Sequence, residues 1–325
     1  MKGRKLILIF LFIVPFITVP CIRSMERACP DATLQVYAIP GQNGSGSEPE
    51  YVANLLGQNV ATIVPIETPS APDLGQERCI RYLRAVLSKN DSKNAIIHAT
   101  SQGTATTLNY LANEDKGKCI KGLILEAPLA TGNSAIIHTL NGPLKNKPVI
   151  ANLPFSYYWV PYCAKASFPC YWPSGKQPIK SIDKIPTNIP IILIHSKNDP
   201  QLSYNDTCAL YYGLRSHGNN NVYLISKDGC NHLQIMQTEA DKQLIRSILE
   251  RHNVLPYSDS SEKREEINLT EYQPDHMQFK ELYDSLINKE RNHDCLRYAG
   301  CVLGFSICLA LFKVVSRFLG PCIRS

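Results

Sequence analysis

The chain has 325 residues, of which 44% are hydrophobic, so it is long enough to bury the core of one large domain or two small ones. Its formal net charge of +6 comes partly from basic residues near its two ends, at positions 2, 4, 5 and 23 and at 297, 313, 317 and 324. The charge is therefore not that of a nucleic-acid-binding face, and we expect no nucleic acid partner.

The first predicted element is a secretory segment over residues 1–24. Three basic residues, Lys2, Arg4 and Lys5, precede an apolar run over residues 6–19, which is typical of a signal peptide. Because no small-residue cleavage site follows the run, an uncleaved signal anchor is the alternative. Both alternatives predict that the chain enters the secretory pathway or the cell envelope.

Residues 25–255 have the pattern of a single α/β domain. Apolar runs rich in β-branched residues predict strands at residues 34–39, 60–66, 95–98, 122–126, 189–195 and 222–226. Amphipathic stretches between them predict helices at residues 76–87, 103–112, 206–217 and 239–251. Strands that alternate with helices are typical of a mostly parallel sheet with helices on both faces.

A long stretch after the fourth predicted strand breaks this alternation. It is rich in proline and carries clustered aromatic residues, namely Phe155, Tyr157, Tyr158, Trp159, Tyr162, Phe168, Tyr171 and Trp172. A connection of this length predicts an inserted lid over about residues 130–186.

Two further segments follow the α/β domain. Residues 256–296 predict a polar linker and an amphipathic helix. Residues 298–319 are apolar apart from Lys313 and Arg317, and a helix of this length spans a hydrocarbon core of about 30 Å if both basic side chains snorkel. The basic residues at its far end predict a cytoplasmic tail, which leaves the α/β domain outside the cytoplasm.

The chain has twelve cysteines, seven of them between residues 29 and 230, which favours an oxidising compartment. No C-x-x-C pair occurs, so the spacing argues against a zinc site. A disulfide between Cys163 and Cys170 is the pairing that we predict first. Since seven is odd, one thiol is expected to be free or to pair elsewhere.

A possible nucleophile lies directly after the third predicted strand. The residues at 99–103 read Ala-Thr-Ser-Gln-Gly and precede a predicted helix, which indicates a nucleophile elbow with Ser101 at its tip. The sharp turn needs small residues two positions before and two after the serine. Gly103 supplies one of them, and Ala99 replaces the usual glycine at the other.

A serine hydroxyl needs a base within reach, and that base needs a carboxylate to orient it. Asp199 follows the fifth predicted strand and His232 follows the sixth, in the chain order Ser, Asp, His of an elbow hydrolase. Asp206 is the main alternative acid, although it can instead cap the next helix. His98 and His195 are the alternative bases, and both also suit packing roles at strand ends.

An oxyanion formed at the site needs preorganised backbone donors. The amide of Gln102, directly after the nucleophile, is the first predicted donor. The second is the amide of Gln42, in the loop over residues 40–44 after the first strand, where Gly41 permits a close approach; a plain glycine-rich turn is the alternative.

These residues resemble the α/β-hydrolase superfamily over roughly residues 30–252. The Ser-Gln-Gly of the elbow and the Asn-Asp-Pro of the acid loop are similar to those of lipases, esterases, acyl-protein thioesterases and prolyl-oligopeptidase-like peptidases. The resemblance implies acyl transfer by Ser101, His232 and Asp199 without a metal or another cofactor. Because the first two strands of the family's sheet have no counterpart here, the resemblance also implies a reduced sheet.

The resemblance and the aromatic lid together predict a serine hydrolase acting on a carboxylic ester or thioester. The expected partners are a small-molecule or lipid acyl substrate and a membrane. A serine peptidase with the same triad is one alternative. A catalytically inactive, membrane-tethered binding module is the other, because Ala99 departs from the elbow motif.

Overall fold

The computed structural model of the chain describes residues 34–44, 49–57, 61–67, 73–89, 94–113, 120–141, 157–158, 161, 169–230, 232–256 and 267–295. The predicted secretory segment, the predicted membrane segment and Cys163 lie outside these ranges. Within them, no helix is long and apolar enough to cross a membrane.

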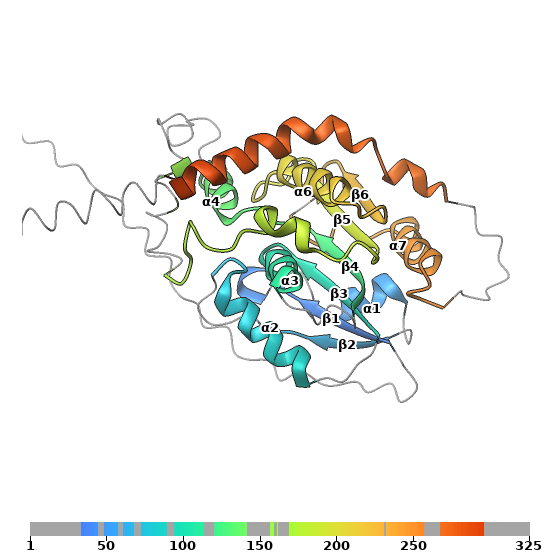
Figure 1. The fold of residues 1–325 in the computed structure, drawn as a ribbon. Coiled ribbons are helices and arrows are strands. Elements are labelled where there is room, and N and C mark those ends of the chain that lie inside the picture. The colour runs from blue at the N-terminus through green and yellow to red at the C-terminus, as the bar shows by residue number, and fades with distance from the viewer. Residues whose placement is uncertain are drawn as a thin grey trace, which may run out of the picture.

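The described residues form a six-stranded sheet in the order β2-β1-β3-β4-β5-β6 (Figure 1). The strands are β1 (Gln35–Ile39), β2 (Thr62–Pro65), β3 (Ala95–Thr100), β4 (Ile120–Glu126), β5 (Ile191–Ser196) and β6 (Val222–Lys227). All five neighbouring pairs are parallel. The prediction of an α/β fold with a parallel sheet is confirmed, and every predicted strand is present.

Helices cover both faces of this sheet (Figure 1). They are α1 (Pro49–Leu56), α2 (Glu77–Lys89), α3 (Gln102–Asn113), α4 (Gly132–Asn141), α6 (Tyr204–Ser216) and α7 (Glu239–Arg251), with 3-10 turns at η1 (Gln42–Gly44), η4 (Pro178–Lys184), η5 (Leu269–Tyr272) and η6 (His276–Phe279). A further helix runs over residues 280–295. Of these, α1 and α4 were not predicted.

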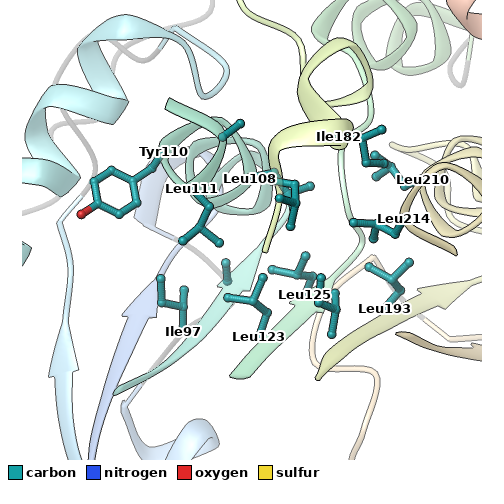
Figure 2. Close-up of a cluster of buried hydrophobic side chains, with 14 of the residues drawn as sticks. Ile97, Leu108, Tyr110, Leu111, Leu123, Leu125, Ile182, Leu193, Leu210 and Leu214 are labelled. Carbon is teal, nitrogen blue, oxygen red and sulfur yellow. The ribbon is translucent and has the colours of Figure 1, made fainter. Parts of the chain in front are cut away.

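The central strands are buried on both faces, as parallel strands under helices must be. On one face Ile97, Leu123 and Leu193 pack beneath Leu108 and the helices around it (Figure 2). Their neighbours along the strands, including Ile96, point to the opposite face against α1 and α7. Each such side chain contributes about 1.5–3 kcal/mol through burial.

The two ends of the predicted lid pack against the body of the protein. Its first part forms α4, and its last part forms η4, which contacts α3 and α6. Ile179 and Ile182 of η4 are buried in the same cluster as Leu108. Apolar side chains at these positions therefore extend the core, and most of the middle of the predicted lid lies outside the described residues.

Candidate active site

Ser101 lies in a sharp turn between β3 and α3, at the carboxyl edge of the sheet. Its φ is +49°, a left-handed value that costs energy for a residue with a side chain. Three hydrogen bonds hold this turn. The Ser101 amide donates to the Glu126 carbonyl at 2.9 Å, and the Thr104 hydroxyl and amide donate to the Ser101 carbonyl at 2.6 and 3.0 Å. The local geometry is that of a nucleophile elbow.

The small residues on either side of Ser101 are required by close packing. A Cβ atom at Gly103 would lie 2.6 Å from the Ile39 carbonyl oxygen and 2.7 Å from that of Pro40. Ala99, two positions before the serine, is fully buried. The elbow therefore presses against the end of β1, directly before the loop that carries Gln42.

Asp199 and His232 are hydrogen-bonded to each other, Nδ1 of the imidazole donating to Oδ2 of the carboxylate at 2.6 Å. The amides of Gln201 and Leu202 donate to Oδ1 at 2.7 and 3.0 Å. Burial opposes ionisation of Asp199, but the hydrogen bonds from His195 and His232 outweigh it and lower the pKa of this carboxyl below its usual range. The carboxylate is thus ionised, and it fixes the His232 tautomer that leaves Nε2 free of a proton.

The structure places the remaining predicted groups at the same edge of the sheet. Gln102 is the first residue of α3, so its amide is at the amino end of a helix. Gln42 begins the short η1 turn after β1, and its side chain is exposed. Among the residues that the structure describes, no hydrogen bond joins the Ser101 hydroxyl to His232, and such contacts often form only when substrate binds.

The alternative acid and bases have other partners. Asp206 lies in the first turn of α6, and burial raises its pKa, with a hydrogen bond from Ser134 acting against the shift. Buried His195 contacts the Thr207 hydroxyl, and its Nε2 lies 3.3 Å from Asp199 Oδ2. It therefore contacts the same carboxylate oxygen that accepts the hydrogen bond from His232.

For three residues near the site, no role in it was predicted from the sequence. His138 of α4 donates from Nε2 to the Asp199 carbonyl at 3.2 Å, which fastens the start of the predicted lid to the acid loop. Glu126, at the end of β4, is fully buried and accepts a hydrogen bond from Tyr51 of α1. A carboxylate that directly follows the apolar run at residues 122–125, in the strand next to the elbow, was the available signal for Glu126.

A cavity of about 640 Å³ lies at the opposite, amino-terminal edge of the sheet. Its lining includes Ile120, Ile189 and His252, and none of the predicted catalytic residues. Cavity size alone would therefore point away from the elbow.

Five cysteines among the described residues are free thiols: Cys79, Cys170, Cys208, Cys230 and Cys295. Burial raises the pKa of Cys79 to about 12 and that of Cys208 to about 11, so both remain protonated. Cys170 is thus a free thiol, and the structure gives no support to its predicted disulfide with Cys163, which lies outside the described residues.

No protein-family model matches the chain, and no match was found among curated proteins. Among solved structures, the chain is similar to an esterase of Pyrococcus furiosus at 18% identity and a TM-score of 0.49, over 68% of this chain and 82% of that one. It is also similar to an acylaminoacyl peptidase of Pyrococcus horikoshii at 17% identity and a TM-score of 0.48, over 70% and 38% of the two chains. A monoacylglycerol lipase of Paleococcus ferrophilus is similar at 12% identity and a TM-score of 0.42, over 67% and 93%. In its parallel sheet, in the serine turn after β3 and in the chain order of Ser101, Asp199 and His232, the protein resembles the α/β-hydrolases.

Proposed function

We propose that the protein is a serine hydrolase that cleaves a carboxylic ester or thioester with an apolar acyl group. The observation that carries the proposal is the short hydrogen bond between Asp199 and His232, at the sheet edge where Ser101 stands in a strained elbow. A buried, ionised carboxylate that orients an imidazole has a direct use in activating a hydroxyl. The strain at Ser101 likewise has a use, because it presents the hydroxyl at the top of the sheet.

In the proposed reaction His232 Nε2 takes the proton of Ser101 as the serine oxygen attacks the carbonyl carbon. Asp199 stabilises the imidazolium that forms and does not itself become protonated. The amides of Gln102 and Gln42 donate to the oxyanion. The imidazolium then protonates the leaving group, and a water molecule, deprotonated by His232, releases the acyl group from Ser101.

A fluorophosphonate probe tests this proposal directly, since it bonds covalently only to an activated serine. We expect stoichiometric labelling of the full chain at Ser101, and no labelling of Ser101→Ala with an unchanged circular dichroism spectrum. If folded wild-type protein is not labelled, the protein is not a serine hydrolase, and the alternative of an inactive binding module gains support.

The substrate class is tested with a matched panel on the labelled enzyme. We expect turnover of p-nitrophenyl esters and acyl thioesters, with kcat/KM rising as the acyl chain lengthens. The corresponding peptide p-nitroanilides should be cleaved much more slowly. A preference for the anilides would instead identify a serine peptidase with the same residues.

We further propose that residues 298–319 tether the enzyme to a membrane with its α/β domain outside the cytoplasm. The support is the apolar sequence, which only Lys313 and Arg317 interrupt. In the full chain, Leu303→Arg combined with Leu309→Arg should move the protein into the carbonate-soluble fraction, because a charge in mid-membrane costs several kcal/mol, about 3 per residue on insertion scales. The substitutions Leu303→Phe and Leu309→Phe are the matched control. N-terminal sequencing establishes that residues 1–24 have been removed, because an uncleaved signal anchor would by itself retain the chain. Unchanged membrane retention of the cleaved arginine variant would contradict a C-terminal tether.

A further inference from the structure

Glu126 is a fully buried carboxylate that none of the proposed catalytic steps uses. It is the last residue of β4 and pairs in register with Thr100, directly before the nucleophile. Its backbone carbonyl accepts the amide proton of Ser101 at 2.9 Å. The backbone carbonyl of Glu126 therefore helps to hold the elbow turn at Ser101.

The side chain of Glu126 holds a different part of the site, the loop that follows His232. Oε2 accepts the amide proton of Ile235 at 3.3 Å. Oε1 accepts the Tyr51 hydroxyl, and that hydroxyl in turn accepts the amide proton of Met236 at 3.4 Å. Glu126 and Tyr51 thus bind two consecutive amides, three and four residues after His232.

Backbone strain is concentrated around these contacts. Five non-glycine residues among those described have a left-handed φ, and three of them adjoin Glu126 or its partners. Ser101 donates to its carbonyl, Ala127 follows it in the chain, and Gln234 precedes the bound Ile235. Such strain persists only where the surroundings hold it in place, and it is typical of functional sites.

The bonding pattern needs a carboxylate and a protonated tyrosine. Glu126 receives a phenol proton and an amide proton, and His98 Nε2 lies 3.4 Å from Oε1. Burial, together with the charge of Glu126, raises the pKa of Tyr51 far above its usual value, so the hydroxyl stays a donor. A glutamine at position 126 would offer one oxygen acceptor and would place an NH₂ donor against another donor.

We infer that Glu126 is a positioning residue that ties the nucleophile elbow to the loop of the base, with Tyr51 as its partner. This inference rests on the proposed function, since it assigns the network to the geometry of Ser101 relative to His232. A displacement of about 1 Å between reacting groups can cost on the order of 10²-fold in rate. Loss of this link should therefore slow the chemistry and leave substrate binding largely intact.

Hydrogen exchange of the full chain tests the structural half of the inference without requiring activity. In Glu126→Gln and Tyr51→Phe, the amides of Ile235 and Met236 should exchange faster than in the wild type. Glu290→Gln and Tyr211→Phe are matched controls: Glu290 is also fully buried and bound by a tyrosine, and the buried Tyr211 donates to the Pro274 carbonyl at 2.8 Å. Unchanged exchange at 235 and 236 in both test variants would overturn the inference.

Kinetics on an ester substrate test the other half. We expect kcat to fall by about 10- to 100-fold in Glu126→Gln, with KM within about twofold of the wild type. Tyr211→Phe should lower the melting temperature and leave kcat unchanged below it. A fall of kcat in proportion to the folded fraction alone would reduce Glu126 to a structural role and overturn the inference. Failure of wild-type Ser101 to react with the fluorophosphonate probe is a separate result, since it overturns the proposed function while the exchange experiment still reports on the link.

Discussion

The pair of His232 with Asp199 and the pair of His98 with Glu126 differ in what surrounds them. His232 is 8% exposed and donates to Asp199 at 2.6 Å, whereas His98 is fully buried and lies 3.4 Å from Glu126. Backbone amides complete both carboxylates. The pairing of an imidazole with a carboxylate therefore occurs once with a slightly exposed ring and once with a fully buried one.

The comparison indicates that the exposure of the imidazole and its distance to the carboxylate, more than the residue type, distinguish the proposed base from a buried structural histidine. An imidazole that transfers protons must reach the reacting atoms. The ring of His98 cannot, because it is fully buried, with its centroid 5.8 Å from that of the Tyr51 ring. The pair of His98 and Glu126 instead fills a buried site in which every lost partner is costly.

The largest contrast is expected between His232→Ala and His98→Gln. Removing the proposed base should slow fluorophosphonate labelling of Ser101 by roughly 10⁴- to 10⁶-fold, because His232 is the group proposed to accept the serine proton. His98→Gln should act mainly on the melting temperature and slow labelling far less. Equal rate losses in the two variants, measured on folded protein, would break the distinction between the pairs.

Asp199→Asn should have the second largest effect. The neutral asparagine side chain lacks the charge that stabilises the His232 imidazolium and no longer fixes the His232 tautomer. We therefore expect kcat to fall by about 10³- to 10⁴-fold with KM nearly unchanged. Glu126→Gln, by contrast, should lose at most about two orders of magnitude. Steady-state kinetics of both variants on one ester substrate measure the two losses in kcat. A smaller loss of kcat in Asp199→Asn than in Glu126→Gln would contradict the proposed role of Asp199 as the acid of the triad.

The acid stability of the protein should depend on Asp199. Its folded-state pKa is below the value of about 3.9 in unfolded chains, so the ionised carboxylate stabilises the fold above that pH. This stability is lost as the pH falls through the folded-state pKa. In urea titrations, the difference in unfolding free energy between wild type and Asp199→Asn should therefore shrink from pH 5 to pH 3.

Glu290 supplies a control of opposite sign. Burial raises the pKa of this carboxyl, with hydrogen bonds from Tyr157 and Asn133 acting against the shift. Relative to Glu290→Gln, the wild type should therefore gain stability as the pH falls from 7 towards 4, where both folded and unfolded states become protonated. If the differences for Asp199 and Glu290 changed in the same direction, the assignment of charge in the folded state would be wrong.

The smallest effect is expected at Ala99, where the elbow departs from the usual glycine. Ala99 is fully buried and fits its strand, so Ala99→Gly should lower the unfolding free energy by about 0.5–1 kcal/mol through backbone entropy. The labelling rate should stay within the same order of magnitude. A large gain in rate would show that alanine at this position restrains the elbow. The contrast is Gly103→Ala, whose Cβ has no room beside the Ile39 and Pro40 carbonyls and should disrupt the turn.

The sequence alone determined the strands and the chain order of the proposed catalytic residues, because both depend on local pattern. A buried parallel strand needs an unbroken apolar run, and a catalytic group after such a strand must emerge at the carboxyl edge. Helices α1 and α4 were missed because they are short, and α4 lay within a stretch whose aromatic residues favoured a lid.

Only the tertiary structure decided which polar groups meet beneath the site. Glu126 meets Tyr51, 75 positions earlier, and Ile235, 109 positions later. His195, for which the sequence suggested a packing role, lies 3.3 Å from the Asp199 carboxylate. No periodicity records such pairings, since each depends on how strands and loops distant in sequence are brought together. The nucleophile elbow could thus be predicted from the local sequence, whereas the hydrogen bonds that link it to the loop of His232 form only in the folded protein.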